Sequence, residues 1–304
     1  MRLGIVLLLV LLAMPAGAVH EKESAAKSSD FTLRVKPGDW GSARAEDVET
    51  LLNAAARELL TYFPGRHLAP LFISHCNDTP IVLYERGPED EYQVQLCAAN
   101  TRWSQYVYEF AHELCHVLSN YERHVAPGMS RRHQWFEESL CEAASLYTLR
   151  RMAITWRVSA PNPEWAAYAP RFAEFAERFY AEPHRHVASA SGLPLWFAQH
   201  QNDLSRNPYL RQHNEVVANV ILPLFERLPE TWGALSYLNL DPASASASFF
   251  EYLRYWHVVV PDTYKPLTSE VLALFGANGA RVSASADPGA FQRADIGPAG
   301  SLAH

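Results

Sequence analysis

Apolar residues recur every three to four positions along several stretches of the chain, and this spacing predicts amphipathic helices. The first such stretch covers residues 43–63, and its apolar positions are Val48, Leu51, Leu52, Ala55, Leu59 and Leu60. Pro64 and Gly65 follow and end the predicted helix. Because one face of this helix is apolar and the other polar, we expect it to pack against a sheet.

Three short runs that alternate apolar and polar residues predict strands over residues 68–75, 80–84 and 92–97. Residues 87–90 lie between the last two strands and have the sequence of a tight turn, Gly-Pro-Glu-Asp. We therefore expect strands 80–84 and 92–97 to pair as a hairpin.

The second half of the chain is helical in its pattern and rich in aromatic residues. Its predicted helices cover residues 163–180, 193–203, 208–227, 230–238, 247–258 and 267–275. Pro223 falls inside the third of these and should kink or divide it. The pattern as a whole predicts an α+β fold. A lobe over residues 31–155 holds a small mixed sheet with helices, and a lobe over residues 156–276 is mainly helical.

The two ends of the sequence differ from the rest. Residues 1–18 have the form of a signal peptide, with Arg2, an apolar run over 3–14 and an Ala-Gly-Ala cleavage site. That run is shorter than the ~20 residues of a membrane span. We expect an exported protein, periplasmic or secreted, without a membrane span after signal cleavage. A polar, flexible lead over 19–30 and a loose tail over 277–304 complete the predicted organisation.

Charge narrows the range of partners. The formal net charge is −7, and the basic residues do not cluster. A mildly acidic chain of this kind does not bind nucleic acid through an electrostatic patch, so nucleic acid is not an expected partner.

Two histidines, His112 and His116, lie four residues apart in a stretch with helical spacing of apolar residues. On an α-helix their side chains are about 40° apart, so both imidazoles can reach one metal ion. Glu113 lies close enough to hold a metal-bound water without ligating the metal. This H-E-x-x-H pattern is typical of zinc peptidases. The alternative is a core helix with two buried, satisfied histidines.

A third ligand is expected from a second helix over residues 135–147. Glu138 and Glu142 are four residues apart and share a face of that helix, whereas Glu137 shares its face with Cys141. We predict Glu138 as the third ligand, and Glu142 as the carboxylate that holds the other ring nitrogen of a ligating histidine. In isolation these acids would indicate only a solvated helix face.

With these residues the sequence resembles the gluzincins, zinc metallopeptidases of the thermolysin and aminopeptidase type. The resemblance covers about residues 90–150 and implies a zincin-like fold with one Zn²⁺ and a peptide or protein substrate. It implies zinc ligation by His112, His116 and Glu138, Glu113 as the general base, and Glu142 as the acid that supports a ligating histidine. The Gly-x-Met-x-Asn strand of the large aminopeptidases is absent, which argues against recognition of a free peptide N-terminus.

The same resemblance implies further parts of a peptidase site. An edge strand before the metal helix binds the substrate by β-addition, and residues 92–97 are the candidate. A His or Tyr from the second lobe donates a hydrogen bond to the developing oxyanion. The sequence does not choose among Tyr209, His213, Tyr237, Tyr255 and His257.

The chain has four cysteines, which is consistent with two disulfides in an exported protein. Cys76 and Cys97 end two predicted neighbouring strands, and we expect them to pair. Cys115 and Cys141 lie at positions that are usually small in the resembled family, where the two zinc helices approach closely. A second disulfide between them is predicted, with a pair of buried free thiols as the alternative.

Together these features predict an exported zinc metallopeptidase. The alternative is a catalytically silent protein of the zincin fold with a binding or structural role in the cell envelope. Glu113 argues against the alternative, because a purely structural zinc site has no use for a base at that position.

Overall fold

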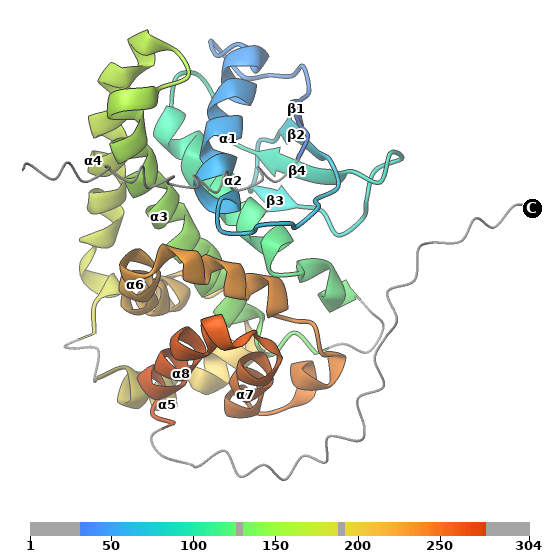
Figure 1. Ribbon diagram of the computed structural model, residues 1–304, viewed down its shortest axis with the longest axis vertical. Coiled ribbons are helices and arrows are strands. Elements are labelled where there is room, and N and C mark those ends of the chain that lie inside the picture. The colour runs from blue at the N-terminus through green and yellow to red at the C-terminus, as the bar shows by residue number, and fades with distance from the viewer. Residues whose placement is uncertain (1–30, 126–129, 188–191, 278–304) are drawn as a thin grey trace, which may run out of the picture.

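The computed structural model describes residues 31–125, 130–187 and 192–277. The predicted signal, the lead over 19–30 and all but the first residue of the predicted tail lie outside these ranges. The described chain has the predicted α+β organisation: a small mixed sheet with helices comes first, and a mainly helical part follows. Figure 1 shows the sheet at one end and helices α5, α7 and α8 at the other, with α6 between them.

The sheet has four strands in the order β1-β2-β4-β3. Strands β1 (Leu33–Val35), β2 (Leu71–His75) and β4 (Tyr92–Leu96) run parallel, and β3 (Ile81–Val82) pairs antiparallel with β4. The predicted hairpin is therefore present, with a much shorter first strand. Helix α1 (Ala45–Leu60) connects β1 to β2 and buries the apolar face that the sequence predicted.

One expectation about the sheet is wrong. Residues 92–97 were the candidate edge strand, but β4 lies inside the sheet because it also pairs with β2 along its whole length, from Leu71↔Tyr92 to His75↔Leu96. The edge beside the metal helix is the two-residue strand β3.

The C-terminal ends of β2 and β4 are joined by a disulfide between Cys76 and Cys97, as predicted. Disulfides are typical of proteins in an oxidising, extracytoplasmic compartment. Within the described ranges no helix has the length and apolar character needed to cross a membrane.

Two long helices form the centre of the molecule. Helix α2 (Trp103–Leu118) and helix α3 (Gln134–Ser159) pack closely against each other, with the short 3-10 helix η1 (Tyr121–Val125) after α2. Helix α3 continues 12 residues beyond the predicted end at Tyr147, because Leu149, Met152, Ala153 and Trp156 are also buried. Almost every residue of the first half of α3 is inaccessible to solvent, so its acidic side chains are interior groups.

The helical part packs on α3 through α4 and α6. Its elements are η2 (Pro163–Tyr168), α4 (Ala169–Tyr180), η3 (Pro183–Arg185), α5 (Leu193–Arg206), α6 (Arg211–Arg227), η5 (Pro229–Tyr237), η6 (Pro242–Ser246), α7 (Phe249–Val259), η7 (Asp262–Tyr264) and α8 (Lys265–Leu274). Pro223 does not divide α6, which is continuous past it, and it lies on the exposed face of that helix.

Candidate metal centre

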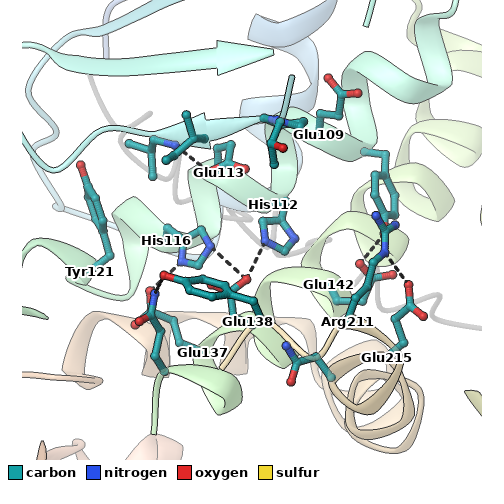
Figure 2. A pocket seen from close by; sticks show the side chains of 18 of the residues that line it. Glu109, His112, Glu113, His116, Tyr121, Glu137, Glu138, Glu142, Arg211 and Glu215 are labelled. Carbon is teal, nitrogen blue, oxygen red and sulfur yellow. Dashed lines mark hydrogen bonds and ion pairs between the residues drawn. The ribbon is translucent and has the colours of Figure 1, made fainter. Parts of the chain in front are cut away.

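Helices α2 and α3 bring His112, His116 and Glu138 to one point. The Glu138 Oε2 atom lies 3.2 Å from His112 Nε2 and 3.6 Å from His116 Nε2. Figure 2 shows both imidazoles directed at this carboxylate. Burial raises the pKa of Glu138, but the two imidazoles outweigh it and hold the pKa well below its ordinary value. The three predicted ligands therefore meet, with the carboxylate in its charged form.

The distances from Glu138 to the two imidazoles are close to those between neighbouring ligands of a tetrahedral zinc ion. Zinc bonds of about 2.0–2.1 Å to nitrogen and 2.0–2.2 Å to oxygen place neighbouring ligand atoms roughly 3.3–3.5 Å apart. The two distances to Glu138 Oε2 lie on either side of that range. Two neutral imidazoles and one carboxylate are also a donor set found at catalytic zinc sites, where a fourth position stays open.

The carboxylate that holds the other ring nitrogen of His116 is Glu137 and not, as predicted, Glu142. Glu137 Oε1 lies 2.6 Å from His116 Nδ1. Helices α2 and α3 run antiparallel, so the turn of α3 beyond Glu138 lies beside the turn of α2 before His112. There Glu142 accepts hydrogen bonds from the Tyr108 hydroxyl and from Arg185 Nη1.

Glu113, the predicted base, is buried beside the two histidines. Its Oε2 accepts a 2.8 Å hydrogen bond from the backbone N–H of Val82 on the edge strand β3. This N–H points away from β4, because the next residue, Leu83, makes the bond to β4 at Gln93. Burial raises the pKa of Glu113 above its ordinary value, although His112 and His116 act in the opposite direction.

Cys141 is a second possible third donor. Within the described residues, its sulfur and ring nitrogens of His112 and His116 lie within 4.8 Å of one another. Two observations favour Glu138. Glu138 lines the cavity in front of the histidines, and Cys141 does not. Burial and a hydrogen bond with Cys115 raise the pKa of the Cys141 thiol well above its ordinary value, and zinc binds the thiolate.

The second predicted disulfide is absent. Cys115 and Cys141 are both buried and free, and their thiols face each other across the contact between α2 and α3. The structure therefore agrees with the alternative, a pair of buried free thiols where the two helices approach closely.

A cavity of about 360 Å³ opens in front of the three ligands. One wall is the edge strand with the residues around it, and the opposite wall is the start of α6. Of the five residues considered as oxyanion donors, only Tyr209 lines this cavity. The His213 ring lies tilted against that of His200, with the ring centroids 4.6 Å apart, and His257 is hydrogen-bonded to Thr268. Tyr209 precedes α6, and Gln134 Nε2 donates to its hydroxyl at 3.2 Å.

One end of the cavity is formed by a network of ion pairs that no sequence motif indicates. Arg185 is fully buried, and its guanidinium donates to Glu142, Glu182 and Glu215. Glu215 also accepts from Arg211 Nε at 2.8 Å. Figure 2 shows Glu142, Arg211 and Glu215 of this network at the opposite end of the site from Tyr121, with Glu138 between.

A second group of possible metal donors lies in the same network, formed by Glu182, His184 and Glu215. His184 Nε2 lies 2.5 Å from Glu215 Oε2, and Arg185 already occupies one oxygen each of Glu182 and Glu215. The arginine supplies the cation here, so the group is an ion-pair network rather than a second metal site.

Comparisons with protein-family models, with curated proteins and with solved structures find no match to this chain. The geometry of the site therefore has to carry the functional argument.

Proposed function

We propose that the protein is an exported, zinc-dependent peptidase. The observation that carries this proposal is the convergence of His112 Nε2 and His116 Nε2 on one oxygen of Glu138 in front of a cavity. The buried carboxylate of Glu113 lies beside this point, which supports a catalytic rather than a structural metal site. The resemblance of the two helices to those of gluzincins supports the same reaction class.

The chemistry divides between the metal and Glu113. His112, His116 and Glu138 would hold the zinc ion, which would act there as a Lewis acid toward a water molecule and a carbonyl oxygen. Glu113 then accepts a proton from the attacking water and returns it to the leaving amine nitrogen. Its raised pKa suits this role, because a carboxylate with a pKa nearer to neutrality is the stronger base toward the attacking water.

The edge strand supports an extended peptide as the substrate. Strand β3 borders the cavity and has no strand on its outer side among the described residues. A peptide that added to this edge would run past the three ligands, although the Val82 N–H is already bonded to Glu113 and would not be one of its donors.

A binding or structural protein of the cell envelope is the second candidate function, and one observation favours it. The Glu113 carboxylate satisfies the otherwise unpaired N–H of Val82, so this glutamate also has a purely structural use. The test must therefore remove the basicity of Glu113 and keep that hydrogen bond.

The substitution Glu113→Gln meets this requirement, because a glutamine side-chain oxygen still accepts from Val82. We expect zinc content and melting temperature to stay close to those of the wild type. Loss of a positioned general base costs about 10²–10⁴-fold in rate, so peptide hydrolysis should fall by that order. The measurement is cleavage of a peptide library by the mature, zinc-loaded protein, with and without a chelator.

Two outcomes would contradict the proposal. A Glu113→Gln variant as active as the wild type would remove Glu113 from the mechanism. A zinc-loaded wild type that cleaves no peptide in the library would favour the binding or structural function.

A further inference from the structure

Asn239, a residue of the helical part, contacts the candidate metal centre through Glu137. It lies between η5 and η6 and is 8% exposed. Its Nδ2 atom donates to Glu137 Oε2 at 2.6 Å and to the backbone oxygen of Ser119, the residue after α2, at 3.0 Å. Its Oδ1 atom accepts from the Tyr252 hydroxyl of α7 at 2.8 Å.

Both ends of the Asn239 amide, the nitrogen and the oxygen, are therefore hydrogen-bonded. Both Nδ2 contacts are to acceptors, a carboxylate and a carbonyl, so the amide cannot be turned over without losing both bonds. The residue is in the left-handed region, with φ of 59°, a conformation that asparagine adopts more readily than most residues. Contacts with Ser119 and Tyr252 fix the Asn239 side chain, and the Asn239 side chain in turn orients Glu137.

The contacts continue to the metal. Glu137 uses its other oxygen, Oε1, to hold His116 Nδ1 at 2.6 Å, and the opposite ring nitrogen of His116 faces Glu138. Glu137 is fully buried, so water does not compete for its oxygens. A carboxylate bonded to a ligating imidazole sets the tautomer and the orientation of the ring, and partners of this kind typically change metal affinity by about 10–100-fold.

We propose that Asn239 is a positioning residue for the metal centre, acting with Tyr252 through Glu137 on His116. This inference rests on the zinc ligands of the proposed function and does not depend on peptide hydrolysis. It means that α7 and the segment after η5, far from the zinc helices in the sequence, tune how tightly the metal is held.

Asn120 provides a matched control. It also has a positive φ, 61°, and it too joins the region after α2 to the end of η5, because its Nδ2 atom donates to the backbone oxygens of Ser236 and Leu238. It does not contact Glu137. Glycine is unstrained at both positions, so Asn239→Gly and Asn120→Gly each remove a side-chain amide without a backbone penalty from φ.

The experiment is a zinc affinity measurement on the full mature chain, by competition with a colorimetric chelator. We expect Asn239→Gly to weaken zinc binding about 10–100-fold and Asn120→Gly to leave it within about threefold of the wild type. Tyr252→Phe, which removes a single hydroxyl, should weaken binding in the same direction by a smaller factor. If Asn239→Gly does not fold, Tyr252→Phe tests the inference in its place.

A double substitution separates positioning from a general loss of stability. In a Glu137→Gln background, Asn239→Gly should have little further effect on zinc affinity, because both act through the same carboxylate. The inference is wrong if Asn239→Gly binds zinc as tightly as the wild type, if both glycine variants weaken binding equally, or if the effects of Glu137→Gln and Asn239→Gly add. A wild type that binds zinc but cleaves no peptide would contradict the proposed peptidase and leave this inference standing.

Discussion

Two different third donors face the same pair of imidazoles, the carboxylate of Glu138 and the thiol of Cys141. They lie three residues apart, almost one turn of α3, so a small rotation of the helix would exchange them. The structure favours Glu138 because its oxygen faces both Nε2 atoms from the cavity side. Cys141 is turned toward Cys115 in the helix contact.

Substitution of each donor distinguishes the two assignments. We expect Glu138→Ala to lose zinc on dialysis, because two imidazoles alone do not complete a site. Cys141→Ala should keep one zinc per chain, since alanine fits where the two helices pack closely. Elemental analysis of the purified variants measures both. Zinc retained by Glu138→Ala and lost from Cys141→Ala would transfer the third position to the thiol.

The choice between Glu137 and Glu142 shows what residue spacing can and cannot predict. Spacing along one helix correctly places Glu138 and Glu142 on related faces. Residue spacing does not show in which direction α2 runs across α3, and that direction decides which acidic side chain contacts His116. Because the helices run antiparallel, Glu142 meets Tyr108 and Arg185 instead.

At the scale of elements, the disulfide between β2 and β4 stabilises the sheet that carries the cavity wall. It closes a loop with a sequence separation of 21 residues. By the chain-entropy relation, a loop of that length contributes about 3 kcal/mol to the free energy of unfolding.

We therefore expect a Cys76→Ala, Cys97→Ala double variant to unfold at lower urea concentration, with the free energy of unfolding reduced by about 3 kcal/mol. Cys115 and Cys141 offer an internal control. Both should be alkylated after denaturation without reduction, whereas Cys76 and Cys97 should react only after reduction. Peptide mapping that finds Cys115 bridged to Cys141 would contradict the structure.

The elements that the sequence predicts best are those whose pattern is local. Helix α1, the hairpin of β3 and β4, and the helix with His112 and His116 follow from apolar spacing and turn residues alone. The position of β4 inside the sheet depends on its parallel pairing with β2, and a local sequence pattern does not predict which strands pair. The length of α3 likewise depends on burial by α4 and α6.

For the whole molecule, the helical part is joined to α2 and α3 by buried polar contacts as well as by apolar packing. Arg185 joins Glu142 of α3 to Glu215 of α6, and Asn239 joins Glu137 of α3 to Tyr252 of α7. Removing one partner from such a buried network leaves another group unpaired, which is costly. These contacts hold the start of α6 against the cavity, so the helical part completes the site.

Tyr209 is the residue through which the helical part would take part in the reaction. It lines the cavity just before α6, its side chain is partly exposed, and it is the one considered donor that reaches this space. A hydroxyl that donates to the developing oxyanion acts mainly in the transition state. We therefore expect Tyr209→Phe to lower kcat for a cleaved peptide by about 10²–10³-fold, with little change in KM and none in zinc content.

Tyr255→Phe is the matched control for this last prediction. Tyr255 is also a partly exposed tyrosine of the helical part, on α7, but it does not line the cavity. Its substitution should leave kcat, KM and zinc content unchanged. Steady-state kinetics on one peptide substrate compares the two variants. If Tyr209→Phe raised KM at constant kcat, the hydroxyl would only bind the substrate. If both variants matched the wild type, the oxyanion would have to be stabilised by another group.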